Sequence, residues 1–184
     1  MIKIRYAQIR ECDVSNGDGI GVSLFVQGCQ FRCPNCFNKD TWDFNDGKEW
    51  TQEINDEFIK LVSRPYIKRV SVLGGEPLAD ENLDGVLNLV NKIRILFPNK
   101  TIWIYSGYTW EQIMSPVVTD DFNLQRDEII HKRREIISKC DILVDGRYID
   151  SQRDITLKWR GSSNQRVINI QESLKKDEIV LWTN

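Results

Sequence analysis

Short β-branched or aromatic runs alternate with amphipathic segments along most of the chain. The runs have the length of buried strands. The segments between them carry apolar residues three or four positions apart, which predicts helices with one apolar stripe. This alternation indicates parallel βα units and an α/β fold of mostly parallel strands. The expected strands are 22–26, 70–73, 101–105, 142–144 and 167–170, with a last one at 179–182, and the expected helices lie at 54–62, 83–96 and 127–139.

Composition and charge narrow the class of protein. The 184 residues contain no linker, repeat or low-complexity tract, so we expect one domain spanning residues 1–184. The net charge of −2 offers no broad basic field, which argues against a nucleic-acid partner. No stretch approaches the ~20 apolar residues of a membrane span, and the N-terminus lacks the apolar core of a signal peptide. We therefore expect a cytoplasmic protein without a membrane partner.

Two polar stretches have plain interpretations. Residues 145–166 are rich in Gly, Ser and Asn and are predicted to be mostly loop. The basic run Lys132, Arg133 and Arg134 is interpreted as a solvated helix face.

Four of the expected strands end in a glycine turn. In parallel α/β folds the carboxyl ends of the strands share one edge, where ligands bind and where glycine lets the backbone approach them closely. The alternative is that glycine is simply common in such turns, which would easily account for two of the four. The turns are Gly28-Cys29, Gly74-Gly75, Ser106-Gly107 and Asp145-Gly146.

Three of the five cysteines, Cys29, Cys33 and Cys36, fall within eight positions in the spacing C-x3-C-x2-C. Such close spacing is poor for disulfides, and thiols stay reduced in the cytosol, so metal or redox chemistry is favoured. Three thiolates on a tight loop can hold an iron-sulfur cubane with one iron left open. An open position indicates chemistry rather than structure.

Non-catalytic metal sites remain as alternatives. A zinc site could be completed by Cys12, Cys140 or His131, and a four-cysteine electron-transfer cluster by Cys12 or Cys140. Zinc sites usually pair two CxxC or CxxH elements, and no second element is present here. His131 lies among charged residues of an expected helix, so we expect it at the surface.

The cysteine triplet after the first main strand, followed by Gly-Gly-Glu-Pro at 74–77, resembles the radical S-adenosylmethionine superfamily. The resemblance implies that Cys29, Cys33 and Cys36 hold a 4Fe-4S cluster whose open iron chelates S-adenosylmethionine. It assigns support of the methionine amino group to Gly74, Gly75 and Glu76. Many members place an aromatic residue against the adenine where this chain has Asn35, so that contact is expected from Asn35, Cys36 and Phe37. Ser106 is a weaker candidate for the ribose or carboxylate side, and a turn residue is an equal interpretation.

A finer resemblance covers residues 14 to 168 and points to the glycyl-radical-enzyme activases that act on anaerobic ribonucleoside-triphosphate reductase. A complete eight-fold barrel needs ~250 residues, so an incomplete βα barrel is implied. An activase of another glycyl-radical enzyme, such as pyruvate formate-lyase, is the nearest alternative. The motifs are 16–20 (NGDGI), 24–29 (LFVQGC), 33–38 (CPNCFN), 41–42 (TW), 105–108 (YSGY), 145–148 (DGRY) and 160–166 (RGSSNQR).

This resemblance also implies a reaction and partners. Reductive cleavage of S-adenosylmethionine gives methionine and a 5'-deoxyadenosyl radical, which takes hydrogen from a glycine α-carbon of the reductase catalytic subunit. The electron would come from a donor such as a flavodoxin or ferredoxin. A protein backbone as substrate requires an open cleft. We hypothesise that residues 145–166, including Arg160 and Arg166, help to dock the reductase; a solvated loop is the equal alternative.

Overall fold

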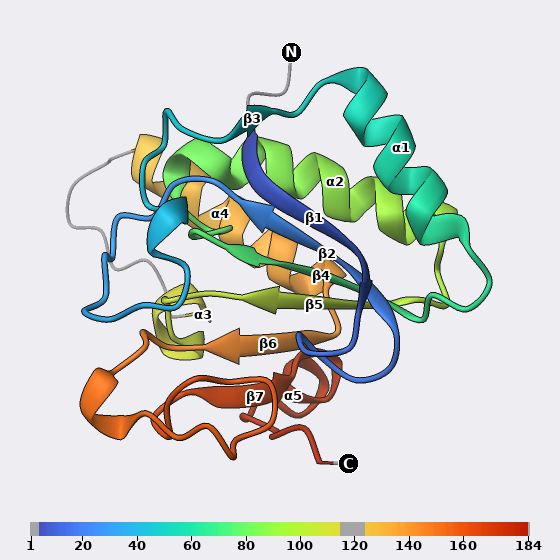
Figure 1. Cartoon of the computed structure of the whole chain (residues 1–184). Coiled ribbons are helices and arrows are strands. Elements are labelled where there is room, and N and C mark those ends of the chain that lie inside the picture. The colour runs from blue at the N-terminus through green and yellow to red at the C-terminus, as the bar shows by residue number, and fades with distance from the viewer. Residues whose placement is uncertain (1–3, 115–123, 184) are drawn as a thin grey trace.

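The computed structural model describes residues 4–114 and 124–183, and a seven-stranded sheet is at its centre. Four parallel strands form the middle, and the strands beside them are antiparallel. The strand order is β3-β1-β2-β4-β5-β6-β7, as Figure 1 shows. The parallel strands are β2 (Gly21–Val26), β4 (Arg69–Gly74), β5 (Thr101–Tyr105) and β6 (Ile142–Asp145), and the antiparallel ones are β1 (Arg5–Asp13), β3 (Lys48–Glu49) and β7 (Arg166–Asn169).

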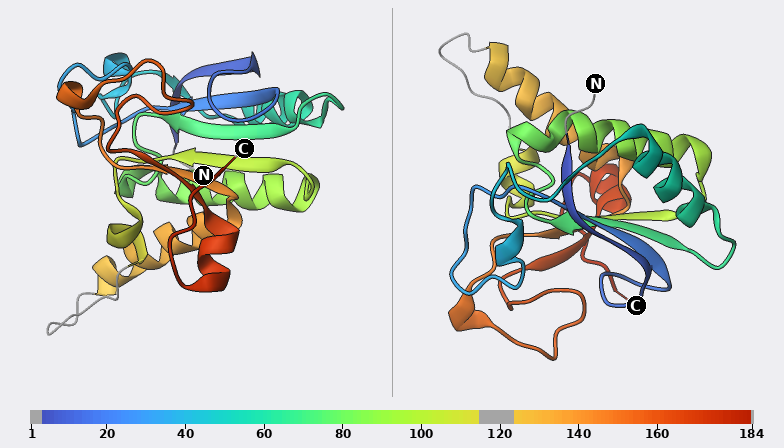
Figure 2. Two further views of the ribbon diagram at one scale, coloured as in Figure 1. Left: turned by 90° about the horizontal axis from the view of Figure 1, so that it is seen from below. Right: turned by 45° about the horizontal axis from the view of Figure 1, so that its top comes forward.

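Helices follow the parallel strands, and α2 and α4 lie against one face of the sheet (Figures 1 and 2). Loops cross the opposite face. No helix among the described residues is long and apolar enough to cross a membrane. The α-helices are α1 (Gln52–Ser63), α2 (Leu83–Leu96), α3 (Trp110–Met114), α4 (Leu124–Lys139) and α5 (Ile170–Lys176), and short 3-10 turns occur at η1 (Lys39–Thr41), η2 (Asp80–Asn82) and η3 (Asp150–Gln152).

The two faces of the sheet carry different side chains because successive residues of a strand point to opposite sides. The helix-covered face is aliphatic and joins the main core. The opposite face, called the open face below, carries serines, aromatic residues and a buried arginine. Core residues of the covered face include Val22, Leu24, Val26, Val70, Val72, Ile102, Ile104, Leu143 and Ile168, while alternate positions place Ser23, Phe25, Ser71, Leu73, Trp103 and Tyr105 on the open face.

Most of the expected elements are confirmed, with one error and several omissions. The segment 179–182 is not a strand. It bonds to β7 from Asn169 N to Val180 O and from Trp182 N to Val167 O, which leaves only a single bridge at Leu181. The sequence also gave no sign of β1, whose register against β2 shifts twice and so breaks the alternation. Strand β3 and helices α3 and α5 are too short for a clear period.

Candidate metal centre and its cavity

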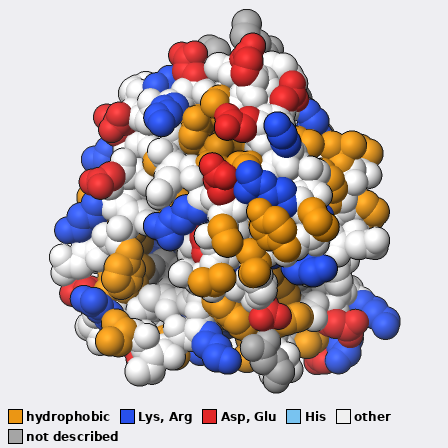
Figure 3. Space-filling view, turned by 45° about the vertical axis from the view of Figure 1, so that its right-hand side comes forward, with side chains coloured by type: hydrophobic (Ala, Val, Ile, Leu, Met, Phe, Trp, Pro, Cys, Tyr) orange, Lys and Arg blue, Asp and Glu red, His pale blue; other side chains and the backbone are white. Residues whose placement is uncertain are grey.

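The four glycine turns meet at one edge of the sheet, as the strand pattern predicts. They surround a cavity of about 590 Å³ on the open face, which is within the range of ligand sites. A hollow edged by hydrophobic, Lys and Arg side chains is visible in Figure 3. The cavity is lined by the three clustered cysteines and by turn residues that include Gly74, Gly75, Glu76, Ser106, Gly107 and Gly146.

Close packing explains two of these glycines. A Cβ on Gly75 would lie 2.3 Å from the carbonyl oxygen of Gly28, which immediately precedes the first cysteine. A Cβ on Gly107 would lie 2.4 Å from the ring of Phe31, inside the cysteine loop. Neither approach is compatible with a side chain. The glycines therefore let the turns after β4 and β5 press directly against the cysteine loop.

Each clustered thiol is free, half-buried and close to backbone N–H groups. Phe31 and Arg32 N–H groups face Cys29, the Tyr148 N–H faces Cys33, and Asn38 N donates to Cys36 Sγ at 3.4 Å. Such donors stabilise thiolates and tune the potential of a bound iron-sulfur cluster.

Burial acts in the opposite direction on the metal-free thiols. It raises the pKa of Cys29 to about 11, although the N–H groups of Arg32 and Phe31 partly offset this. Burial and the neighbouring Cys36 also raise the pKa of Cys33. Metal binding requires thiolates, so the thiols must lose their protons when a metal group is bound.

The donor set of the cavity suits an iron-sulfur cluster, because three free thiols from one loop line it. In the described part of the chain, no three His, Cys, Asp or Glu side chains come together as ligands of one metal ion. A cubane presents a separate iron to each thiolate, so its three sulfurs need not converge on one point. A lone zinc ion requires all ligands within about 2.3 Å of one centre. The residues present therefore fit a 4Fe-4S group bound through three thiolates.

The other candidate ligands lie elsewhere. Cys140 is fully buried in the core beneath the covered face, just before β6 begins, and Cys12 is exposed in β1 beside the start of β2. Both positions are at the opposite edge of the sheet from the clustered cysteines. His131 is exposed on α4, as expected.

Glu76 joins the turns after β4 and β5 from a fully buried position. Its Oε1 accepts hydrogen bonds from Leu78 N and Ser106 Oγ, both at 2.8 Å, and its Oε2 accepts one from Gly107 N at 2.7 Å. Burial raises the pKa of this carboxyl to about 7, against the effect of these donors. The Ser106 hydroxyl is thus committed to Glu76, and it also accepts from Tyr108 N.

Asn35 and Phe37 differ in their relation to the cavity. Phe37 lines it and stacks edge to face with Tyr148, with ring centroids 5.3 Å apart. Asn35 does not line it, and its Nδ2 donates to Asp150 Oδ2 at 2.8 Å. These contacts tie the Cys33–Cys36 half of the loop to the turn after β6.

A second anchor holds the Cys29–Cys33 half. Gln30 Nε2 donates to the Tyr108 hydroxyl at 2.8 Å, and the rings of Phe31 and Tyr108 lie 4.8 Å apart. The same hydroxyl accepts from Arg133 Nη2 at 2.7 Å, and the Arg133 guanidinium also lies over the Tyr108 ring. The cysteine loop is therefore fastened to the turn after β5 and, through Arg133, to α4.

This anchor overturns the interpretation of the 132–134 run as a solvated helix face. Besides Tyr108, Arg133 binds Asp80 Oδ1 and the Leu78 carbonyl oxygen. Lys132 forms ion pairs with Asp84 and Glu128, and Arg134 donates to two carbonyl oxygens of α3. All three side chains are engaged because they face α2, α3 and the β4 turn, which lie far away in the sequence.

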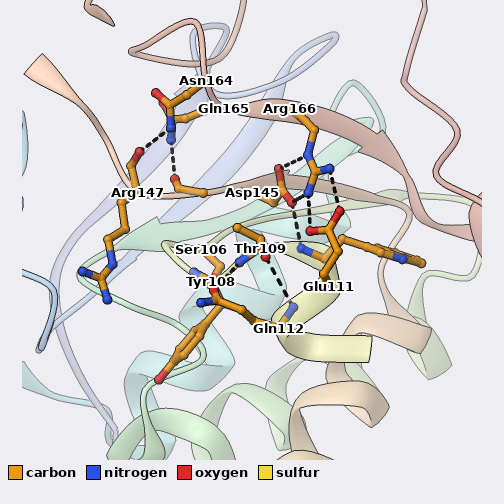
Figure 4. A network of polar contacts seen from close by, with 12 residues as sticks. Ser106, Tyr108, Thr109, Glu111, Gln112, Asp145, Arg147, Asn164, Gln165 and Arg166 are labelled. Atoms are coloured by element: carbon orange, nitrogen blue, oxygen red, sulfur yellow. Dashed lines mark hydrogen bonds and ion pairs between the residues drawn. The ribbon is translucent and has the colours of Figure 1, made fainter. Parts of the chain in front are cut away.

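The ends of the 145–166 segment are held internally, as Figure 4 shows. Arg166 donates to both carboxylate oxygens of Glu111, each at 2.8 Å, and forms an ion pair with Asp145. Asp145 in turn accepts from Trp110 N at the start of α3. Arg166 is thus a clamp between β7, β6 and α3 and is not directed toward the cavity, whereas Arg160 lines it.

Two further cavity residues, Trp42 and Tyr105, fall within the resemblance motifs at 41–42 and 105–108, but no role was predicted for them. The Tyr105 hydroxyl and the Trp42 indole Nε1 are buried and have no hydrogen-bond partner among the described residues. Tyr105 ends β5 directly before Ser106, so its place at a strand end could have marked it. The motif at 41–42 does not indicate that the Trp42 indole is buried in the cavity, because Trp42 enters the site through the fold of the loop after η1.

Comparison with known proteins identifies the class to which this fold and site belong. The family described as a 4Fe-4S single cluster domain matches residues 15–168, which contain all three clustered cysteines. The chain is 35% identical over 91% of its length to the whole anaerobic ribonucleoside-triphosphate reductase-activating protein of Escherichia coli K12. It is 37% identical to the Vibrio cholerae protein of that name, over 88% of this chain and 96% of the relative. The relative from Enterobacteria phage T4 is 33% identical, with coverages of 89% and 93%. The chain therefore belongs to the 4Fe-4S family of anaerobic ribonucleoside-triphosphate reductase-activating proteins.

Proposed function

We propose that this protein is a radical S-adenosylmethionine activase that generates the glycyl radical of an anaerobic ribonucleoside-triphosphate reductase. When held by Cys29, Cys33 and Cys36, a reduced 4Fe-4S cluster would supply the electron for reductive cleavage of S-adenosylmethionine. One observation carries the proposal: the three thiols of the C-x3-C-x2-C loop line the same cavity as the Gly74–Glu76 turn. A small molecule bound to the cluster therefore lies beside the cysteine loop after β2 and beside the turn after β4 at the same time.

The residues of the chain divide the work of binding. Cys29, Cys33 and Cys36 hold the cluster, and the turn formed by Gly74, Gly75 and Glu76 receives the amino end of the methionine moiety. Glu76 does so mainly through its position, because its carboxylate is already bonded to Leu78, Ser106 and Gly107. This arrangement preorganises the turn before the ligand arrives.

The adenine and ribose contacts are assigned to the same edge. We place the adenine against the backbone of Asn35, Cys36 and Phe37, because Phe37 lines the cavity while the Asn35 side chain is held by Asp150. Ser106 supports the ribose or carboxylate side through its bond to Glu76.

The fold suits a macromolecular substrate. We propose that residues 1–184 act as one domain and that the curved arrangement of strands is an incomplete βα barrel, open on the face that carries the cavity. The reductase catalytic subunit presents a glycine backbone to this face. An electron donor of the flavodoxin or ferredoxin kind reduces the cluster, and the cytoplasm keeps the thiols reduced.

Anaerobic reconstitution with iron and sulfide tests the proposal. The protein should bind about one cubane and, when reduced with dithionite, convert S-adenosylmethionine to 5'-deoxyadenosine. Cys29→Ala, Cys33→Ala and Cys36→Ala should each abolish this cleavage, because each removes an iron ligand. Cys12→Ala is the matched control and should retain it, since Cys12 lies at the other edge of the sheet.

The partner is tested separately with two purified glycyl-radical enzymes. Electron paramagnetic resonance should detect a glycyl radical on the anaerobic reductase and none on pyruvate formate-lyase. A radical on pyruvate formate-lyase alone would transfer the proposal to that enzyme. A colourless protein that retains zinc would contradict it entirely.

A further inference from the structure

The segment after β6 forms a structured rim beside the cavity. Its 3-10 turn η3 is followed by a loop closed by the Arg153–Ser162 bridge and by a hydrogen bond from Asp154 N to Gly161 O. The base is fastened by Asn164 Nδ2, which donates to the Arg147 carbonyl oxygen (Figure 4). The loop therefore projects its tip, residues 155–158, from a fixed base.

Apolar side chains are exposed along this rim. Ile155 at the tip is 83% exposed although it also lines the cavity, and Phe37 of the cysteine loop, which lines the same cavity, is 61% exposed. Single exposed apolar residues are ordinary, but two that line the same cavity indicate an interaction surface. Leu157 continues the apolar lining from the tip into the cavity.

The rim is also positively charged in a chain whose net charge is −2. Residues 147–160 contain four basic and two acidic side chains, a net charge of +2. Both carboxylates are engaged locally, Asp150 by Asn35 and Tyr148, and Asp154 by Thr156. Within the described residues, none of the four cations forms a salt bridge: Arg147, Arg153, Lys158 and Arg160.

We propose that this rim docks the glycine-bearing segment of the protein substrate, a stretch with an apolar side chain and a net negative charge near the glycine. The inference rests on the proposed function. Glycine has no side chain that could reach inward, so its main chain must itself enter the cavity and pass over the rim. The apolar side chain of the substrate packs against Ile155 and Phe37, and its carboxylates face Arg153 and Lys158.

The test compares matched pairs of variants. Ile155→Asp places a carboxylate on the rim, and Ile95→Asp makes the same change at a residue of α2 that is 79% exposed. Lys158→Glu is matched by Lys175→Glu on α5. For each reconstituted protein the affinity for the reductase catalytic subunit is measured by titration, and cleavage of S-adenosylmethionine is measured with dithionite and no reductase.

Ile155→Asp and Lys158→Glu should each weaken binding to the reductase by about tenfold, while the control variants change it less than about twofold. Added salt should weaken binding of the wild type more than that of Lys158→Glu. Cleavage without the reductase should be unchanged in Lys158→Glu and in both control variants, because none of these residues lines the cavity. Wild-type affinity in both rim variants would overturn the docking proposal and leave the activase intact. Loss of the uncoupled cleavage in Lys158→Glu would also overturn it, by assigning the rim to the cluster site. Failure of the wild type to form a glycyl radical would instead contradict the proposed function.

Discussion

The two faces of the sheet are built for different purposes, although the same strands form both. On the covered face, aliphatic residues pack under α1, α2 and α4 in one continuous core. On the open face, a smaller apolar cluster around Trp103 lies beside serines, a buried arginine and a cavity. Burial of apolar area therefore stabilises the fold mainly from one side. The other side is free to expose polar groups to a ligand.

Away from the cavity, the open face carries a buried arginine whose guanidinium is hydrogen-bonded. Arg69 is fully buried at the start of β4, and its guanidinium donates to the carbonyl oxygens of Asp13, Asn16 and Asp18. These bonds fix the loop before β2. Nearer the cavity, the Tyr105 hydroxyl is buried without a partner. The Tyr105 hydroxyl lines the cavity, where a bound ligand could satisfy it, whereas Ser23 Oγ and Trp182 Nε1, also without a partner among the described residues, lie outside the cavity.

Two neighbouring residues of β5 give the strongest test of the difference between the covered face and the open face. Ile104 faces the covered core and is fully buried, while Tyr105 faces the cavity. Ile104→Ala should lower the free energy of unfolding by about 2–5 kcal/mol, because it leaves a void in a packed core. Tyr105→Phe should leave it unchanged within about 1 kcal/mol, because the lost hydroxyl has no partner in the protein. Urea unfolding of the metal-free protein measures both.

For ligand binding the order of the two effects should be reversed, with Tyr105→Phe having the larger effect and Ile104→Ala the smaller one. Tyr105→Phe should weaken binding of S-adenosylmethionine to the reconstituted protein by about two- to tenfold, as expected for one lost hydrogen bond. Ile104→Ala should alter it less, per folded molecule. Tyr66→Phe, on an exposed residue after α1, is the control. Equal destabilisation by Ile104→Ala and Tyr105→Phe would show that the two faces do not differ in this way.

The sequence predicted what depends on neighbours in the chain. The buried strands, the long helices and the cysteine spacing are local patterns, and so are the glycine turns that place Cys29 and Gly75 at one edge. Parallel topology then brings those turns together without further information. The cavity edge was therefore predictable before any contact was known.

What the sequence could not predict depends on partners far along the chain. Gln30 and Tyr108 are 78 positions apart, and nothing near Arg133 distinguishes it from a solvated basic residue. The hydrogen bond from Arg133 to the Tyr108 hydroxyl arises only when β5 and α4 are in place. Such pairings are set by tertiary packing, so a helix-surface interpretation of 132–134 was the natural error.

Tyr108→Phe tests whether the open face depends on this anchor. The change keeps the ring beside Phe31 but removes the oxygen that receives Gln30 and Arg133. We expect a loss of about 1–2 kcal/mol in the stability of the cysteine loop, for two neutral or charge-assisted bonds. The reconstituted variant should lose iron to a chelator several-fold faster than wild type or Tyr66→Phe. Unchanged iron loss would mean that the thiolates alone hold the loop.

The smallest expected effect concerns the Arg166 clamp between β7, β6 and α3. Arg166 lowers the pKa of Glu111 to about 2, so this carboxylate stabilises the fold above its unfolded pKa of about 4.5, and the contribution is lost as pH falls from 4.5 toward 2. Glu111 is 55% exposed in its side chain, so solvent screening limits the contribution to less than about 1 kcal/mol. Glu111→Gln should therefore lower the free energy of unfolding slightly at pH 7 and not at pH 2. Glu76 has the opposite sign, because its raised pKa makes the metal-free fold less stable as pH rises from about 4.5 to about 7. Unfolding measured from pH 2 to pH 8 in wild type and Glu111→Gln separates the two: the difference in free energy of unfolding between the proteins should be constant above pH 4.5 and disappear as pH falls from 4.5 toward 2. A difference that instead varies between pH 4.5 and pH 7 would assign the effect to the cavity rather than the clamp.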